Sequence, residues 1–219
     1  MSTALSHLNP VATYEAFIMY HALNLISFLA IAVTSIIPAI ASHVELRLLN
    51  CPDVAVFFAR GTTEIPTIGT SVGPPFSAAL TAALPGKHVV FKGINYPAAV
   101  VGLITGGDIG GGVSMANNVS STVSECPGTK IVMSGFEQGA LVTHLAINQL
   151  LSSIQDHVTA VVTFGDPRKD VILPGVLQSR RKTFCFHADP ICAGQLPILP
   201  PYNYGADTPA AAAYVAAHV

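Results

Sequence analysis

The segment KIVMSGFEQGALVTHLAINQLL (130–151) decides the fold of this chain. Its first part, KIVMSGF (130–136), is an apolar run with the character of a buried strand. Its last part, ALVTHLAINQLL (140–151), repeats apolar residues at helical spacing. The two parts meet in GFEQG (135–139), whose paired glycines suit a tight turn. The segment therefore predicts a strand, a glycine turn and a helix in immediate succession.

The same alternation continues on both sides of this unit. Further strands are expected over 53–60, 88–94, 160–166 and within 180–189, and further helices over 74–84, 113–125 and 208–219. Strands that alternate with helices predict an α/β fold, a three-layer α/β/α sandwich around a central, mostly parallel five-stranded sheet. The strands are apolar almost throughout rather than at every second residue, which agrees with burial on both faces.

The turns that follow the strands are where chemistry is expected. In sheets of this kind, ligands bind beyond the carboxyl ends of the strands. The GFEQG turn lies at that edge and has the spacing of G-x-S-x-G, the turn on which many hydrolases present a nucleophilic serine. Glu137 occupies the central position, while Gly135 and Gly139 are retained. We therefore expect the backbone of such a turn with a different reacting group.

Composition excludes several classes of function. The 219 residues carry a net charge of −2 and form no basic stripe, so no nucleic-acid partner is expected. The glycine-rich GGDIGGG (106–112) lacks the Lys-Ser/Thr of a phosphate loop and fails the Rossmann spacing, so it is interpreted as a flexible connector.

The N-terminal stretch Ala22–Ala41 has no formal charge and ends in the small-x-small pattern Ala39-Ile40-Ala41. It predicts a signal peptide over residues 1–41, followed by a single domain over 42–219 in a secreted, extracellular protein. Residues 1–21 contain no Lys or Arg, so translation from Met19, a signal anchor or an apolar tail are the alternatives. Pro38 and the polar residues before it argue against stable membrane insertion.

The chain has four cysteines, an even number that favours disulfides in a secreted chain. We favour Cys51–Cys126, because each residue precedes a strand of a parallel sheet, and Cys185–Cys192, which bracket a short loop. The alternative, a metal site, has no C-x-x-C pair or histidine cluster to support it. Asn118 begins an Asn-Val-Ser sequon, a glycosylation site only if the chain is secreted.

Five segments, in order, resemble the cutinase and acetylxylan esterase family of serine esterases. They are CPDVAVFFARGTTE (51–64), CPGTKIVMSGFEQGALV (126–142), VTFGDP (162–167), FCFHADPICAG (184–194) and PYNYGADTPAAAAYV (201–215). The resemblance runs from Cys51 to the C-terminus and includes all four cysteines. It implies a small lidless α/β-hydrolase that is secreted, needs no cofactor or metal, and hydrolyses carboxylic esters through a Ser-His-Asp triad.

The resemblance assigns roles residue by residue. The triad acid maps to Asp189, and the oxyanion hole maps to Thr62 and the backbone N–H of Gln138. The nucleophile maps to Glu137, and the catalytic histidine of the family's H-x-x-Y pattern maps to Pro201. Two of the three triad positions are therefore substituted.

These substitutions predict a catalytically inactive or severely impaired family member. A proline cannot transfer protons, and a carboxylate with an ordinary pKa of about 4.3 is a poor nucleophile towards an ester. We expect the Glu137 carboxylate to turn towards the N–H groups of Thr62 and Gln138, where an oxyanion would otherwise form. The expected partners are an ester substrate or a polyester or polysaccharide surface, and we expect a monomer.

Two alternatives stay open at this point. One is an active cutinase or acetylxylan esterase, acting on cutin or other carboxylic esters by a route that the triad positions do not reveal or because the sequence has errors at these positions. The other is a hydrolase that uses Glu137 as a carboxylate nucleophile. His187, two residues before Asp189, could supply an imidazole near the site, although a surface position is the simpler interpretation.

Overall fold

The five predicted strands form one sheet in which every neighbouring pair is parallel. This computed structural model describes residue 19 and residues 51–195 and 203–219. Pro201 and all of the predicted signal peptide except residue 19 lie outside these residues. The strands are β1 (Val54–Ala59), β2 (Val89–Gly93), β3 (Lys130–Phe136), β4 (Val158–Phe164) and β5 (Arg181–Phe184). Their order across the sheet is β2-β1-β3-β4-β5, so β3 and its glycine turn stand at the centre.

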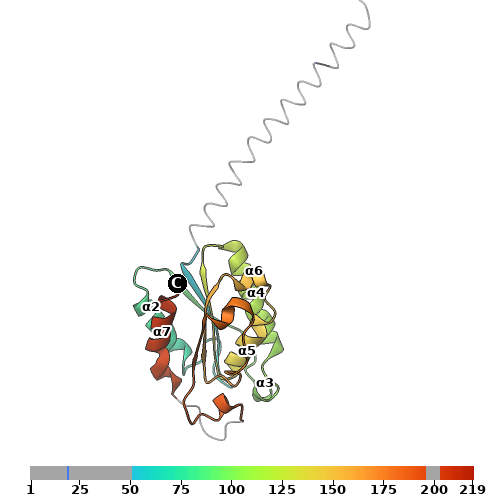
Figure 1. The fold of residues 1–219 in the computed structure, drawn as a ribbon, viewed down its shortest axis with the longest axis vertical. Helices are drawn as coiled ribbons and strands as arrows, with labels where there is room; N and C mark the ends of the chain where they lie inside the picture. Colours follow the sequence, from blue (N-terminus) through green and yellow to red (C-terminus); the bar gives the residue numbers. More distant parts are fainter. Residues whose placement is uncertain (1–18, 20–50, 196–202) are drawn as a thin grey trace, which may run out of the picture. The chain divides into compact units, whose positions relative to one another are not determined.

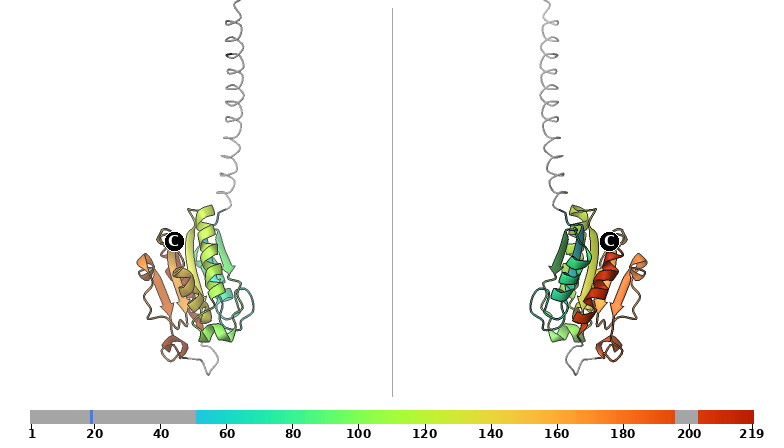
Figure 2. Two further views of the ribbon diagram at one scale, coloured as in Figure 1. Left: turned by 90° about the vertical axis from the view of Figure 1, so that its right-hand side faces the viewer. Right: turned by 90° about the vertical axis from the view of Figure 1, so that its left-hand side faces the viewer.

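Helices cover both faces of the sheet, as predicted (Figure 1). One face carries α2 (Gly73–Ala83) and α7 (Thr208–Ala216). The other carries α4 (Ile109–Glu125) and α5 (Gln138–Ile147), and the shorter α3 (Val100–Ile104) and α6 (Ser152–Gln155) lie on the same side. Figure 2 looks onto each helical layer in turn, with α4 and α5 in front of the sheet in the left view and α2 and α7 in front of it in the right view.

Burial follows the position of each strand in the sheet. All six residues of β1 are buried, and β3 and β4 are buried over most of their length, whereas the edge strands β2 and β5 are partly exposed. Successive side chains point to opposite faces, so Phe57 joins the core under α4 and α5 while Phe58 joins the core under α2 and α7.

The interpretation of residues 106–112 as a flexible connector is wrong in its second half. Gly106 and Gly107 make the turn with φ of 90° and 118°, a region that favours glycine. The side chain of Asp108 then accepts a hydrogen bond from the N–H of Gly111 at 2.6 Å and caps α4. Helix α4 therefore begins at Ile109, four residues earlier than predicted, because the capping aspartate outweighs the low helix propensity of the glycines.

Two disulfides close the structure as favoured. Cys51–Cys126 joins the residues ahead of β1 and β3, with 5.6 Å between the Cα atoms. Cys185–Cys192 closes the short loop after β5, with 6.0 Å between the Cα atoms. In the parts of the chain that the structure describes, no helix is both long enough and apolar enough to cross a membrane.

Candidate active site

Glu137 stands in the strained turn between β3 and α5. Its backbone has φ of 54° and ψ of −113°, which is rare for a residue with a side chain and is found where surrounding structure enforces it. The N–H of Glu137 donates to the carbonyl of Phe164 at 2.9 Å. A Cβ atom on Gly139 would lie 1.9 Å from the carbonyl oxygen of Ala59, so only glycine allows α5 to pack this close to the sheet. The tight turn predicted from the glycines of GFEQG (135–139) is therefore present in the structure.

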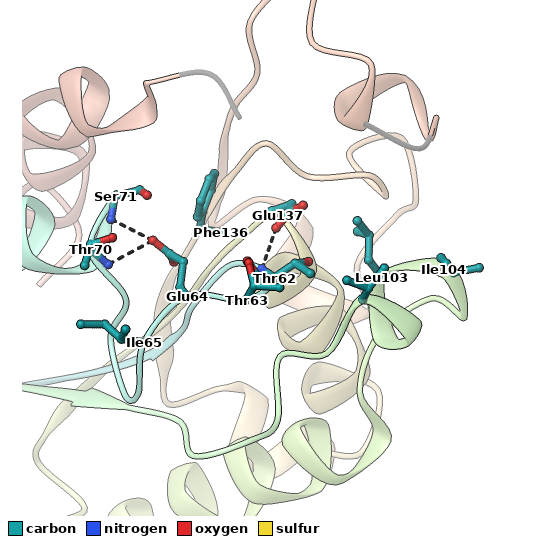
Figure 3. Close-up of a pocket in the computed structure, with 11 residues that line it drawn as sticks. Thr62, Thr63, Glu64, Ile65, Thr70, Ser71, Leu103, Ile104, Phe136 and Glu137 are labelled. Atoms are coloured by element: carbon teal, nitrogen blue, oxygen red, sulfur yellow. Dashed lines mark hydrogen bonds between the residues drawn. The ribbon is translucent and has the colours of Figure 1, made fainter. Parts of the chain in front are cut away.

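The Glu137 carboxylate is held by the turn that follows β1 (Figure 3). Its Oε2 atom accepts a hydrogen bond from the backbone N–H of Thr62 at 2.7 Å, and the residue is only 6% exposed. Burial raises the pKa of Glu137 above its ordinary value of 4.5. The hydrogen bonds from Thr62 and the N–H of Gln138 oppose this shift, and the negative charge of Glu64 adds to it. A carboxylate oxygen thus occupies the hydrogen-bonding position of the Thr62 N–H.

Glu64 fixes the shape of that turn from within. Its carboxylate accepts hydrogen bonds from the N–H of Gly61 at 2.8 Å, of Thr70 at 3.0 Å and of Ser71 at 2.8 Å. No sequence pattern indicates this role, because Glu64 and two of its three donors lie six or seven residues apart in an irregular segment. The turn carrying Thr62 is consequently preorganised whatever occupies the neighbouring site.

Arg60 and Tyr96 support the same turn from behind. The Arg60 guanidinium donates to the carbonyls of Glu64 and Tyr96, each at 2.7 Å, and lies over the Tyr96 ring at 4.9 Å. The Tyr96 hydroxyl donates in return to the Arg60 carbonyl. These reciprocal contacts bury the Arg60 charge beneath the turn.

Gln138, the residue after Glu137, links three segments of the site. Its Nε2 atom donates to the Thr62 hydroxyl at 3.0 Å and to the carbonyl of Ala99 at 2.8 Å. The side chain therefore ties the start of α5 to the Thr62 turn and to Ala99, the residue before α3. This contact orients the Thr62 turn towards Glu137.

A cavity of about 630 Å³ opens above Glu137. Its walls combine hydroxyl-bearing, acidic and apolar residues, namely Thr62, Thr63, Glu64, Ile65, Thr70, Ser71, Val100, Leu103, Ile104, Phe136 and Glu137. Figure 3 shows that they come from the turn after β1, from α3 and from the end of β3. The cavity therefore lies at the carboxyl edge of the sheet, where the sequence predicted a ligand site.

Asp189 lies in the disulfide-closed loop after β5. It is buried, and it accepts hydrogen bonds from the Tyr204 hydroxyl at 2.5 Å and from the N–H of Ile191 at 2.9 Å. His187 is exposed and lines, with Asp189, a separate cavity of about 360 Å³. No histidine among the described residues has a hydrogen bond to Glu137. The assignment of the catalytic histidine position to Pro201 stays a prediction, since that residue lies outside the described ones.

A further buried carboxylate, Asp166, binds several partners that the sequence did not predict. It accepts hydrogen bonds from His144 Nε2 at 3.0 Å, from the Thr163 hydroxyl at 2.9 Å, from the Arg168 N–H at 2.8 Å and from Arg181 at 3.1 Å. Burial opposes its ionisation, but these partners together hold the pKa of Asp166 below its ordinary value of 3.8. The F-G-D-P segment marked the residue, but neither His144 nor Arg181 carried a sequence signal.

The predicted glycosylation site lies inside α4. Both polar atoms of the Asn118 amide are engaged, because Oδ1 accepts from Lys92 Nζ at 2.6 Å and Nδ2 donates to the Ser114 carbonyl at 2.7 Å. Its glycosylation stays a prediction. The described residues contain no group of three or more His, Cys, Asp and Glu side chains arranged to hold a metal ion.

A parallel five-stranded sheet covered by helices, with a strained residue between its central strand and the next helix and a facing N–H from the turn after β1, defines a small α/β-hydrolase. Comparisons with known proteins identify the family within the α/β-hydrolases. The cutinase family model matches residues 50–219. The chain belongs to the cutinase family.

Individual relatives agree with this assignment. A cutinase of Coprinopsis cinerea is 54% identical over 192 residues, which are 87% of this chain and 96% of the relative. A cutinase of Botryotinia fuckeliana is 44% identical, with 83% of this chain and 89% of the relative covered.

Solved structures lead to the same family. The Trichoderma reesei cutinase in complex with a phosphonate inhibitor superposes with a TM-score of 0.71 at 37% identity, covering 75% of each chain. An acetyl xylan esterase solved at 0.90 Å has a TM-score of 0.64 at 26% identity, covering 77% of this chain and 99% of that one.

Proposed function

We propose that this protein is a secreted member of the cutinase family that binds ester-bearing material and hydrolyses it very slowly or not at all. The observation that carries the proposal is the hydrogen bond of 2.7 Å between the Thr62 N–H and Glu137 Oε2. In an esterase of this fold, that N–H would stabilise the negative charge that develops on the substrate oxygen.

The chemistry of ester hydrolysis supports the proposal. Attack on the carbonyl requires a nucleophile and a base that accepts its proton and returns it to the leaving alcohol. Glu137 has no hydroxyl proton to give up. The tetrahedral adduct of its carboxylate with an ester would expel the carboxylate, the better leaving group, rather than the alkoxide, and the ester would be regenerated. Its charge also repels the developing oxyanion in a buried site, where solvent screens the repulsion poorly. Both effects raise the barrier to hydrolysis.

The rim of the cavity supports affinity for an apolar ester surface. Ile65, Val100 and Ile104 line the cavity and are exposed, and Val101 beside them is exposed as well. Apolar side chains gathered in this way around a cavity favour contact with a polyester, an acylglycerol or an acetylated polysaccharide. Secretion is supported by the two disulfides and by the predicted signal peptide.

A kinetic comparison of p-nitrophenyl butyrate hydrolysis tests the proposal. The parent protein is expected to stay at the uncatalysed background. The double variant Glu137→Ser, Pro201→His should exceed the parent by about 10²-fold or more, the lower end of what general acid–base catalysis contributes. The single variant Glu137→Ser should gain far less, because it has a nucleophile but no base.

The matched control is Glu125→Ser, which makes the same substitution on an exposed residue, the last one of α4. It should remain as inactive as the parent. Clear turnover by the parent, lost on Glu137→Ala, would identify an active esterase and refute the proposal. A double variant that folds but gains no activity would show that the assignment of Pro201 or Asp189 is wrong.

A further inference from the structure

The Glu137 carboxylate is only partly satisfied by the protein. Its Oε2 atom is bonded to the Thr62 N–H, while Figure 3 shows the other oxygen directed away from Thr62. Glu137 lines the cavity of about 630 Å³ although the residue as a whole is 6% exposed. The carboxylate has little contact with water, one short hydrogen bond from Thr62 and further support from the N–H of Gln138, and its pKa is still raised. A further donor or a positive charge in the cavity would therefore stabilise its charged form.

No basic side chain lines this cavity within the described part of the chain. Its two ionisable lining residues are Glu64 and Glu137, and both are acidic. Glu64 is already satisfied by three backbone N–H groups. Arg60 lies behind the turn, where its guanidinium is committed to two carbonyl groups and the Tyr96 ring. The charge of Glu137 is therefore the one that a ligand could neutralise.

The remaining walls suit an aliphatic chain. Ile65, Leu103, Ile104 and Phe136 supply apolar surface, and the cavity volume lies in the range of small-molecule sites. A ligand whose polar end reaches Glu137 would lay its hydrocarbon part along these residues. A neutral ester placed the same way would find the Thr62 N–H already engaged, and an anion would meet like charge.

We propose that this cavity binds ligands with a cationic ammonium head and an aliphatic tail, the ammonium group pairing with Glu137. The inference rests on the proposed function, because it takes the Thr62 N–H to be bound to Glu137 rather than offered to an ester carbonyl. The substitution at the nucleophile position would then have changed the preferred ligand of the cavity from neutral to cationic.

Isothermal titration calorimetry at pH 7.5 with three ligands of equal chain length tests the preference. Octylammonium should bind the parent at least about tenfold more tightly than 1-octanol, since hydrogen bonds to charged groups contribute more than neutral ones. Octanoate should bind most weakly. In Glu137→Gln the preference for octylammonium over 1-octanol should disappear, and in the exposed control Glu125→Gln it should remain.

Three results would overturn the inference: 1-octanol binding the parent as tightly as octylammonium, no binding of octylammonium, or a preference that survives in Glu137→Gln. Circular dichroism establishes that each variant is folded. Measuring p-nitrophenyl butyrate turnover on the same preparations separates the two proposals. Turnover by the parent refutes the proposed function, whereas an inactive parent without the ammonium preference refutes only this inference.

A pH series on the parent gives a second measurement that needs no variant. Octylammonium affinity should fall as Glu137 becomes protonated, while 1-octanol affinity should not. The other charged or titratable groups around Glu137 are Glu64, Arg60 and Tyr96 beside the Thr62 turn, and Asp189 with Tyr204 beyond the Phe136 ring. An octylammonium affinity that is unchanged across the acidic titration would contradict the pairing with Glu137.

Discussion

Glu137 and Asp166 are two buried carboxylates at the same edge of the sheet, and their environments act on them in opposite directions. Glu137 follows β3 and Asp166 follows the neighbouring β4 by two residues. The pKa of Glu137 is raised and that of Asp166 is lowered, although both lose contact with water. Burial alone therefore does not decide the charge of a carboxyl group.

The difference lies in the hydrogen-bond donors that the protein supplies. Asp166 accepts from an imidazole, a hydroxyl, a backbone N–H and a guanidinium, which together outweigh the cost of desolvation. Glu137 has one short hydrogen bond, from Thr62. Asp166 is thus a charged group that the surrounding side chains stabilise, whereas the donors around Glu137 do not outweigh its desolvation.

The largest change in stability is expected from removing the charge of Asp166, the carboxylate with the most hydrogen-bond donors. Asp166→Asn should lower the free energy of unfolding by about 3–5 kcal/mol, because the buried Arg181 guanidinium loses its counter-charge. Urea denaturation followed by circular dichroism measures this. The exposed Asp170, paired with Lys169, provides the matched control, and Asp170→Asn should change little.

The stability lost in Asp166→Asn should also depend on pH, and it should be smaller in acid. Because the pKa of Asp166 is lowered on folding, its stabilisation is present above the ordinary value of 3.8 and disappears as the pH falls through the folded value. The deficit of Asp166→Asn should therefore shrink in strong acid. A deficit that is small at pH 7, or that grows on acidification, would show that the Asp166 partners do not favour its charged form.

An intermediate effect is expected at the third carboxylate of this edge. Asp189 has two donors, Tyr204 and the Ile191 N–H, and so lies between Glu137 and Asp166. Tyr204→Phe removes one donor at a buried position and should cost about 1–3 kcal/mol of unfolding free energy. Thermal and urea unfolding give the value, and the half-buried Tyr214→Phe serves as control. A negligible change in unfolding free energy would show that the hydrogen bond from Tyr204 to Asp189 contributes little to stability.

The smallest effect, of opposite sign, is expected at Glu137. Glu137→Gln keeps an oxygen for the Thr62 N–H and removes a buried charge, so the protein should gain up to about 1 kcal/mol at pH 7. Because the pKa of Glu137 is raised on folding, the parent is penalised as the pH rises from 4.5 through the folded value. The gain should vanish below pH 4.5. Destabilisation at pH 7 would mean that the carboxylate is better satisfied than its contacts indicate.

The layered fold could be predicted from local sequence patterns, because burial and backbone conformation restrict which residues a strand or a tight turn can contain. Apolar runs such as 130–136 fix a buried strand, and Gly135 and Gly139 fix a turn that tolerates no side chain at either position. The start of α4 at Ile109 differs from the prediction because the glycines around Asp108 have low helix propensity and conceal its role as the capping residue. The pairings Cys51–Cys126 and Cys185–Cys192 followed from strand position and loop length.

The sequence by itself determined the family, the sheet and the presence of a carboxylate in the glycine turn after β3, since each depends on residues close together in the chain. Only the tertiary structure decided what that carboxylate touches. Thr62 and Glu137 lie 75 residues apart, and His144 and Asp166 lie on different elements. The pKa of a buried carboxyl group depends on the hydrogen-bond donors that packing brings to it. Side-chain packing across the sheet is not encoded in any local sequence pattern.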